Sequence, residues 1–199
     1  MADSRTFALV RHGGTDYNAA RRLNGDPSVP VGLTDDGRAQ VAMLRDQIGD
    51  MPIDLGVHTR FPRTRQTLDI LLEGGRDVPV VECPELDDVL LGEFEGASVD
   101  DYRRFRDENG QDARPRGGES RVDALRRYAR GLERLLAADA RAPLVVTHDI
   151  PIRFLANAIA GEDPLEGPVR AVGNASLTTA SEEELRRGVE AMNRRLAQA

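Results

Sequence analysis

The stretch FALVRHGGTDYN, residues Phe7 to Asn18, decides the fold class and points to a functional site. Its four apolar residues, 7–10, predict a buried strand because they form a short continuous apolar run. The chain then enters Arg11 and His12, followed by two glycines that would let a backbone approach a ligand closely. A core strand does not need an arginine and a histidine at its exit, so this pair indicates a site.

A second apolar stretch, APLVVTH, predicts a strand over residues 142–148 that also ends in a histidine, His148. Asp149 and Pro151 follow it and are expected to be the N-cap and first-turn proline of a helix. Ligands of open α/β sheets bind beyond the carboxyl ends of the strands. If the two strands are parallel neighbours, His12 and His148 therefore meet at one site.

Strands and helices alternate along the chain, which favours an α/β fold with a largely parallel sheet. The hydrophobic pattern predicts strands at residues 6–10, 52–57, 78–82, 142–148 and 175–180. Capping residues and helical periodicity predict helices at residues 34–48, 63–72, 100–107, 120–136, 149–159 and 181–197. His58 follows the second strand and is interpreted as a packing residue or part of a pocket rim.

The composition is that of a globular protein, with 40% hydrophobic and 31% charged residues, and 199 residues suit a single domain over 1–199. The net charge of 27 − 34 = −7 argues against a nucleic-acid partner, although a local basic pocket stays compatible with it. All the basic residues are arginines. Any anion site must therefore use guanidinium groups, backbone N–H groups and histidines.

Other features bound the cellular setting and the assembly. The single Cys83 cannot form an intrachain disulfide, and neither a signal peptide nor a membrane span is evident, so a cytoplasmic protein with no membrane partner is expected. Ser181 and Glu184 form a capping box that opens an amphipathic C-terminal helix at about 181–197. This helix is expected to complete the core or to pair with another subunit in a homodimer.

The residues around the two histidines suit a doubly charged phosphoryl group. The segment TRFPRTRQT adds Arg60, Arg63 and Arg65 near a helix start, where free N–H groups also favour phosphate. Zinc fits less well, because there is no HExxH motif or cysteine cluster and an arginine would repel a cation. No metal site is therefore expected.

A neutral imidazole in such a pocket can attack phosphorus directly, and flanking guanidinium groups would hold its pKa low enough to keep it neutral. The reaction then needs an acid to protonate the leaving alkoxide. The acidic segment PELDDVLLGEFEG offers five candidates, and the residues alone do not choose among them: Glu85, Asp87, Asp88, Glu93 and Glu95.

These motifs, in this order, resemble the histidine phosphatase superfamily, in its phosphoglycerate mutase-like branch. LVRHGGTDYN resembles the family signature R-H-G-x-[ST]-x-x-N, and TRFPRTRQT, LDDVLLGEFEG, PRGGES and VVTHD resemble later family segments. The resemblance runs from about residue 7 to residue 174. It implies a three-layer α/β/α sandwich with a mostly parallel central sheet and a chemistry that uses no metal or organic cofactor.

The resemblance also implies roles for individual residues. His12 would be the nucleophile that becomes phosphohistidine, and Asp88 would protonate the leaving group. The phosphoryl group would be held by Arg11, Arg63 and His148. The substrate pocket would be lined by Thr15, Asn18, Asn24, Gly25 and Asp149.

Three positions depart from the family pattern: Gly14 and Asp88 stand where glutamate is usual, and Asp149 stands where glycine is usual. Asp88 is one methylene shorter than glutamate, and Asp149 brings negative charge toward the phosphate site unless it caps the helix.

The favoured function is a cofactor-independent phosphomonoesterase, of the histidine acid phosphatase type, acting on a small phosphorylated metabolite. A phosphoglycerate mutase is the first alternative, although the chain between GEFEG and PRGGES is short for one. A phosphate-binding or regulatory module with weak catalysis is the second. Specificity is expected to lie in loops within residues 24–32, 83–106 and 110–119.

Overall fold

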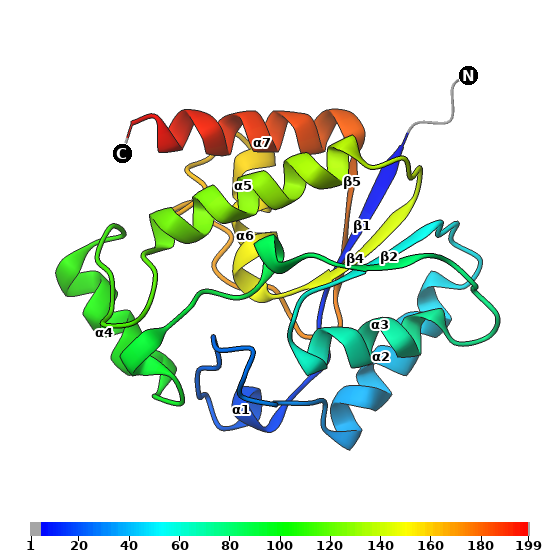
Figure 1. Cartoon of the computed structure of the whole chain (residues 1–199), viewed down its shortest axis with the longest axis horizontal. Coiled ribbons are helices and arrows are strands. Elements are labelled where there is room, and N and C mark those ends of the chain that lie inside the picture. Colours follow the sequence, from blue (N-terminus) through cyan, green and yellow to red (C-terminus); the bar gives the residue numbers. More distant parts are fainter. Residues whose placement is uncertain (1–4, 199) are drawn as a thin grey trace.

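The computed structural model describes residues 5–198, and within them a single five-stranded sheet forms the centre of the molecule (Figure 1). Its strands are β1 (Thr6–Arg11), β2 (Leu55–His58), β3 (Val80–Glu82), β4 (Pro143–Thr147) and β5 (Leu177–Ser181). They lie in the order β3-β2-β4-β1-β5. Only β5, at one edge, is antiparallel to its neighbour among these strands, so the prediction of a mostly parallel sheet is confirmed.

Side chains of β1 alternate between the two faces of the sheet, as the pleat of a strand requires. Phe7 and Leu9 join one apolar cluster, whereas Ala8 and Val10 join another. The first cluster includes α5 (Arg121–Ala137), α6 (Asp149–Ile159) and α7 (Glu182–Leu196), and the second includes α2 (Asp35–Ile48) and α3 (Pro62–Leu72). Helices thus cover both faces, which confirms the three-layer α/β/α sandwich.

The remaining helices lie outside these layers. They are α1 (Asp16–Ala19), which follows the end of β1, and α4 (Val99–Asn109), together with two single 3₁₀ turns at Pro84–Leu86 and Gly92–Phe94 (Figure 1). The sequence did not predict α1. Its start is fixed by a capping box between Thr15 and Asn18.

Three predicted strands begin two or three residues later than expected. β2 begins at Leu55, three residues after Pro52, and β3 begins at Val80, directly after Pro79, which has no N–H to donate to a strand ladder. Before β5, Ala175 has φ 48°, in the left-handed region that an extended strand cannot contain. Its N–H instead bonds the carbonyl of Arg11 at 3.1 Å, which ties the start of β5 to the end of β1.

The predicted C-terminal helix, α7, completes the apolar core. Leu185, Val189 and Met192 are buried in the cluster that also contains residues of α5 and α6. Ser181 and Glu184 form the expected capping box at its start. Pairing with another subunit stays a prediction.

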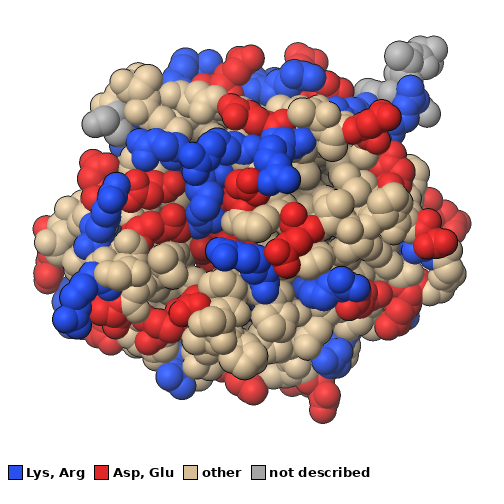
Figure 2. All heavy atoms as spheres, in the orientation of Figure 1, with Lys and Arg blue, Asp and Glu red and all other residues tan. Residues whose placement is uncertain are grey.

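Charged side chains of both signs cover the face seen in Figure 2, and basic side chains form a row over α5. Arg126 and Arg134 of this helix are ion-paired with Asp123 and Glu85. Among residues 5–198, no helix combines the length and the apolar character that crossing a membrane requires.

The first turn of α2 packs directly on the loop that follows His12. A Cβ atom built on Gly37 would lie 2.0 Å from the carbonyl oxygen of Gly14. Alanine in place of a helical glycine normally stabilises by about 1 kcal/mol. We expect Gly37→Ala to lower the free energy of unfolding instead, by about 1–3 kcal/mol, because the methyl group must displace backbone.

Urea denaturation measures this change. Arg38→Ala is the matched control, since Arg38 is an exposed neighbour in the same helix and its loss is expected to matter little. A Gly37→Ala variant as stable as the parent chain would contradict the close contact between α2 and the loop.

Candidate active site

The two histidines that end β1 and β4 lie side by side. The two strands are parallel neighbours with Arg11 opposite Thr147, so the next residues, His12 and His148, leave the sheet together. Their ring centroids are 5.4 Å apart, and the exposed fractions of the two residues are 2% and 0%. The predicted meeting of the two histidines is therefore confirmed.

Arg63, in the first turn of α3, connects both rings through one buried guanidinium group. Its Nε donates to Nε2 of His12 at 3.0 Å, and one Nη lies 3.2 Å from Nδ1 of His148. The guanidinium group also donates to the side-chain oxygen and the carbonyl oxygen of Asn24. It lies over the ring of Phe61, which in turn packs against His148.

These contacts define which nitrogen of each imidazole carries the proton. Nδ1 of His12 lies 2.7 Å from the carbonyl oxygen of Gly13. A carbonyl can only accept and a guanidinium can only donate, so the proton is on Nδ1 and Nε2 carries the lone pair. By the same argument, Nδ1 of His148 accepts from Arg63, and its Nε2 donates to the hydroxyl of Thr59 at 2.9 Å.

Both imidazoles are held in the neutral form. Burial is the largest cause that lowers the pKa of His12 far below its usual range, and the positive charges of Arg63 and Arg11 lower it further. Burial and Arg63 likewise lower the pKa of His148. The sequence attributed this neutrality to the arginines, whereas the larger effect is loss of solvent around the rings.

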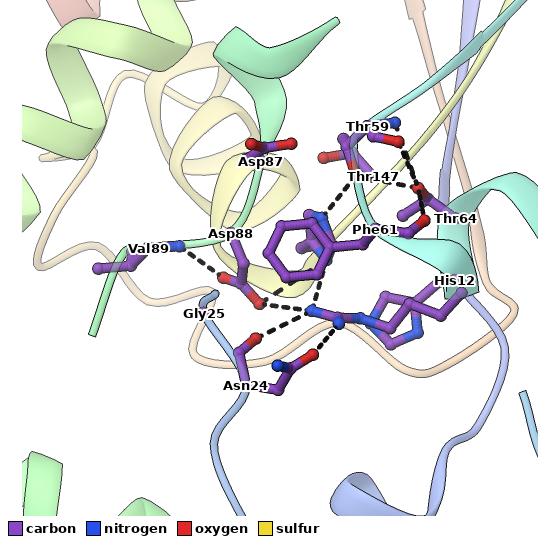
Figure 3. A network of polar contacts seen from close by, with 12 residues as sticks. His12, Asn24, Gly25, Thr59, Phe61, Thr64, Asp87, Asp88, Val89 and Thr147 are labelled. Carbon is purple, nitrogen blue, oxygen red and sulfur yellow. Dashed lines mark hydrogen bonds and ion pairs between the residues drawn. The ribbon is translucent and has the colours of Figure 1, made fainter. Parts of the chain in front are cut away.

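Of the five acidic candidates in the loop, Asp88 is the one that faces the histidines. Its Oδ2 lies 3.6 Å from an Nη of Arg63 and 3.7 Å from Nδ1 of His148. Its Oδ1 accepts from the backbone N–H of Val89 (Figure 3). Burial raises the pKa of the Asp88 carboxyl, against the lowering effect of Arg63.

The other four carboxylates are engaged elsewhere. Asp87 accepts from Arg60, while Glu85 and Glu93 pair with Arg134 and Arg116. Glu95 has a role that the sequence did not reveal. It accepts from the side chain of Asn24 and from the backbone N–H groups of Gly25 and Asp26, and so fixes the loop that meets Arg63.

A cavity of about 180 Å³ opens beside this group and brings most of the predicted residues together. Those that line it are Arg11, His12, Thr15, Asn18, Asn24, Arg63, Asp88 and Asp149. His148 and Gly25 lie outside the lining. His148 is buried against Arg63, and Gly25 packs tightly on the segment after Asp88, since a Cβ there would lie 2.0 Å from the carbonyl of Val89.

The predicted helix cap at Asp149 is wrong. The helix α6 already begins at Asp149, and the residue at the N-cap position is His148. The carboxylate of Asp149 instead accepts from the backbone N–H of Val172 at 2.6 Å and lies 3.5 Å from Arg153. Its negative charge near the cavity is thus balanced by a guanidinium group rather than used as a cap.

Arg11 has hydrogen-bonding capacity left over within the described chain. Its Nη1 donates to the carbonyl of Val172, but its buried Nε has no hydrogen-bond partner among residues 5–198. The other two arginines of TRFPRTRQT point elsewhere, because Arg60 pairs with Asp87 and Arg65 pairs with Asp69. In the same part of the chain, no group of three or more His, Cys, Asp or Glu side chains is arranged to hold a metal ion.

Comparison with known families agrees with the motifs and the geometry. The model of the histidine phosphatase superfamily (branch 1) matches residues 7–195. The chain belongs to the histidine phosphatase superfamily.

The relatives of this histidine phosphatase superfamily member are named for different activities. The chain is 32% identical to the adenosylcobalamin/alpha-ribazole phosphatase of Salmonella typhimurium, over 70% of this chain and 72% of that protein. It is 29% identical to the "probable phosphoglycerate mutase GpmB" of Serratia proteamaculans, over 77% of this chain and 74% of that protein.

Solved structures share the fold. The alpha-ribazole phosphatase from Shigella flexneri superposes with a TM-score of 0.78 at 24% identity, covering 87% of this chain and 89% of that one. A mycobacterial glucosyl-3-phosphoglycerate phosphatase solved with VO₃ gives a TM-score of 0.72 at 28% identity, covering 88% and 92%.

The lowered pKa values of the two histidines can be tested by titration. We expect the ring ¹⁵N signals of His12 and His148 to stay those of neutral imidazole at pH 6, below the ordinary histidine pKa of 6.5. Because the unfolded chain takes up these protons and the folded chain does not, stability should fall as the pH drops below about 6.5.

Arg63→Met should raise both pKa values, since it removes a positive charge that disfavours the imidazolium form. Arg65→Met, in the same helix but paired with the exposed Asp69, is the control and should not move them. Titration midpoints near 6.5 for both rings of the parent protein would refute the assignment.

Proposed function

We propose that this protein is a cofactor-independent phosphomonoesterase that acts on a small phosphate ester through a phosphohistidine on His12. The observation that supports it best is the state of His12. Its Nε2, at the edge of the cavity, carries a lone pair and accepts from the Arg63 guanidinium group. Its Nδ1–H donates to the carbonyl oxygen of Gly13. A neutral, oriented imidazole next to fixed positive charge is suited to attack a phosphoryl group.

In the first step, the Nε–H of Arg63, which donates to Nε2 of His12 in the free protein, turns to a phosphoryl oxygen and frees the Nε2 lone pair. Nε2 then attacks phosphorus, and the bond between phosphorus and the ester oxygen breaks. Asp88, in its acid form, gives its proton to that oxygen, so the alcohol leaves neutral. Burial raises the pKa of Asp88, which favours this acid form. The phosphorylated ring becomes cationic, and its Nδ1–H stays bonded to the Gly13 carbonyl.

In the second step, water attacks the phosphohistidine, and the Asp88 carboxylate takes one of its protons. The bond between Nε2 and phosphorus breaks, which returns neutral His12 and releases inorganic phosphate. Arg11 and Arg63 would bind the equatorial oxygens in both steps and spread their negative charge. His148 would act beside Arg63, with its Nδ1 facing the guanidinium group.

The nucleophile can be tested with a generic aryl phosphate. We expect His12→Ala to lower kcat for its hydrolysis by at least about a thousandfold, because no other side chain supplies the attacking atom. His58→Gln is the matched control. His58 lies outside the residues that line the cavity, so its replacement should leave turnover near that of the parent.

The intermediate is tested by quenching the parent enzyme during turnover and locating phosphate by mass spectrometry, with the phosphate expected on the peptide that contains His12. Undiminished turnover by His12→Ala would refute the proposal. Transfer of the trapped phosphate between 2- and 3-phosphoglycerate faster than its release to water would show a mutase instead. Tight phosphate binding without turnover would identify a binding module.

The role of Asp88 predicts a dependence on the leaving group. Asp88→Asn should lower kcat/KM for alkyl phosphates by about 10²–10⁴-fold, because an alkoxide leaves poorly without a proton. The loss should be much smaller for an aryl phosphate with an acidic phenol. Glu93→Gln, in the same loop but ion-paired with Arg116, is the control. Equal losses for both ester classes would contradict the acid role of Asp88.

A further inference from the structure

A second cavity, of about 370 Å³, adjoins the first one and is lined mainly by guanidinium groups. Its described lining consists of Arg103 and Arg106 of α4, Arg121 of α5, Arg153 of α6, and Leu165, Val169 and Arg170 from the segment after α6. No carboxylate belongs to this described lining. Such a gathering of positive charge stands out in a chain whose net charge is −7.

Arg121 is the least explained member of this cluster. The residue is 4% exposed, and its Nε and one Nη are buried without a hydrogen-bond partner anywhere in residues 5–198. Its guanidinium group lies over the ring of Phe154, 4.8 Å from the centroid. Arg121 is also the first residue of α5, and a cation opposes the positive end of the helix dipole there.

The charges around Arg121 make its burial more unfavourable rather than less. Burial lowers its pKa to about 10, and the positive charges of Arg153 and Arg106 act in the same direction. The group is still protonated at neutral pH. A buried cation with unsatisfied donors and cationic neighbours is unfavourable for folding, which is typical of a group kept for binding.

The neighbouring arginines are partly neutralised by carboxylates. Arg106 lies 2.6 Å from Asp107, whose side chain is 66% exposed. Arg103 lies 3.4 Å from Asp100, and Arg153 lies 3.5 Å from Asp149. The side chain of Arg103 is 54% exposed, so its ion pair is weak. The row on α5 differs from this cluster, because Arg126 and Arg134 there pair with carboxylates on the outer surface.

Position connects this cluster to the proposed reaction. Four arginines line both cavities: Arg103, Arg106, Arg121 and Arg153. They therefore form the boundary between the second cavity and the cavity that contains His12 and Arg63. A molecule whose ester phosphate lies at His12 would extend its far end toward these four side chains. Guanidinium groups bind phosphate and carboxylate oxygens through paired N–H donors.

We propose that the four arginines form a second anion subsite, and that the preferred substrates carry a phosphate or carboxylate group in addition to the ester phosphate that is cleaved. This inference rests on the proposed phosphomonoesterase activity.

A series of matched compounds tests the subsite: α,ω-alkanediol bisphosphates and ω-carboxyalkyl phosphates, each compared with the alkyl monophosphate of the same chain length. We expect kcat/KM to be about 10–100-fold higher for the dianionic member at the chain length that spans the two cavities. Since the second group is bound equally before and during reaction, the difference should lie mainly in KM. The two series separate phosphate from carboxylate recognition.

Arg121→Met removes the charge and keeps the apolar stem. The substitution should lower the ratio of kcat/KM for the dianionic compound to kcat/KM for the matched alkyl monophosphate by about tenfold or more. The fall should come from a rise in KM for the dianionic compound. Arg106→Gln, whose side chain is 26% exposed, is a second variant that tests the same ratio with less risk to folding. Arg130→Met is the matched control, an exposed arginine on the same helix outside both cavities.

Thermal unfolding separates a binding role from a structural one. If Arg121 is kept for binding, Arg121→Met should unfold at a temperature equal to or above that of the parent, because an unpaired buried charge is removed. A large fall in the unfolding temperature, with the substrate ratio unchanged, would overturn the proposal.

The outcomes also distinguish this inference from the proposed function. Hydrolysis of both compound classes at equal efficiency would refute the second subsite and leave the phosphomonoesterase intact. Failure to hydrolyse any of the compounds, together with no phosphohistidine on His12, would refute the proposed function itself.

Discussion

One buried positive charge, that of Arg63, organises the candidate site. Its guanidinium group contacts two imidazoles, one carboxylate and the loop at Asn24, and it comes from a helix rather than from either histidine strand. Because the charge cannot be moved to solvent, each neighbour must present a lone pair or a negative charge to it. That requirement fixes the tautomers of His12 and His148 and keeps Asp88 close.

Adjacent residues of the acidic loop show how position, more than residue type, separates structural from chemical roles. Asp87 is buried and the side chain of Asp88 is 24% exposed, yet both have raised pKa values, with loss of solvent as the first cause. Asp87 accepts from the backbone and the side chain of Arg60 and so anchors the loop outside the cavity. Asp88 points the opposite way, toward Arg63 and His148.

The sequence predicted the parts of the site that follow from local pattern and strand order. An apolar run ending in Arg11 and His12, a second ending in His148, and the parallel sheet together imply that the histidines meet. The burial of the rings, which dominates their pKa values, depends on layers of side chains that no single segment contains. The cap expected at Asp149 was wrong because its carboxylate accepts from the backbone N–H of Val172, a partner that only the folded chain brings near.

The same limit applies to Arg121, Arg106 and Arg153. They lie on three different helices, and each one alone has the pattern of an ordinary surface arginine. Only their convergence on one cavity distinguishes them. Glu95 is similar, since its bonds to Gly25 and Asp26 join loops about seventy residues apart in the chain.

The link between β5 and the loop after β1 has a consequence for biosynthesis. The carbonyl of His12 accepts from the side chain of Asn174, and Ala175 bonds the carbonyl of Arg11. During translation, the histidine near the amino end therefore emerges long before the segment that supports its loop. A nascent chain that has not yet reached Asn174 would carry the imidazole of His12 without the buried surroundings of the folded site. Its reactivity would then be that of an ordinary exposed histidine until the final strand joins the sheet.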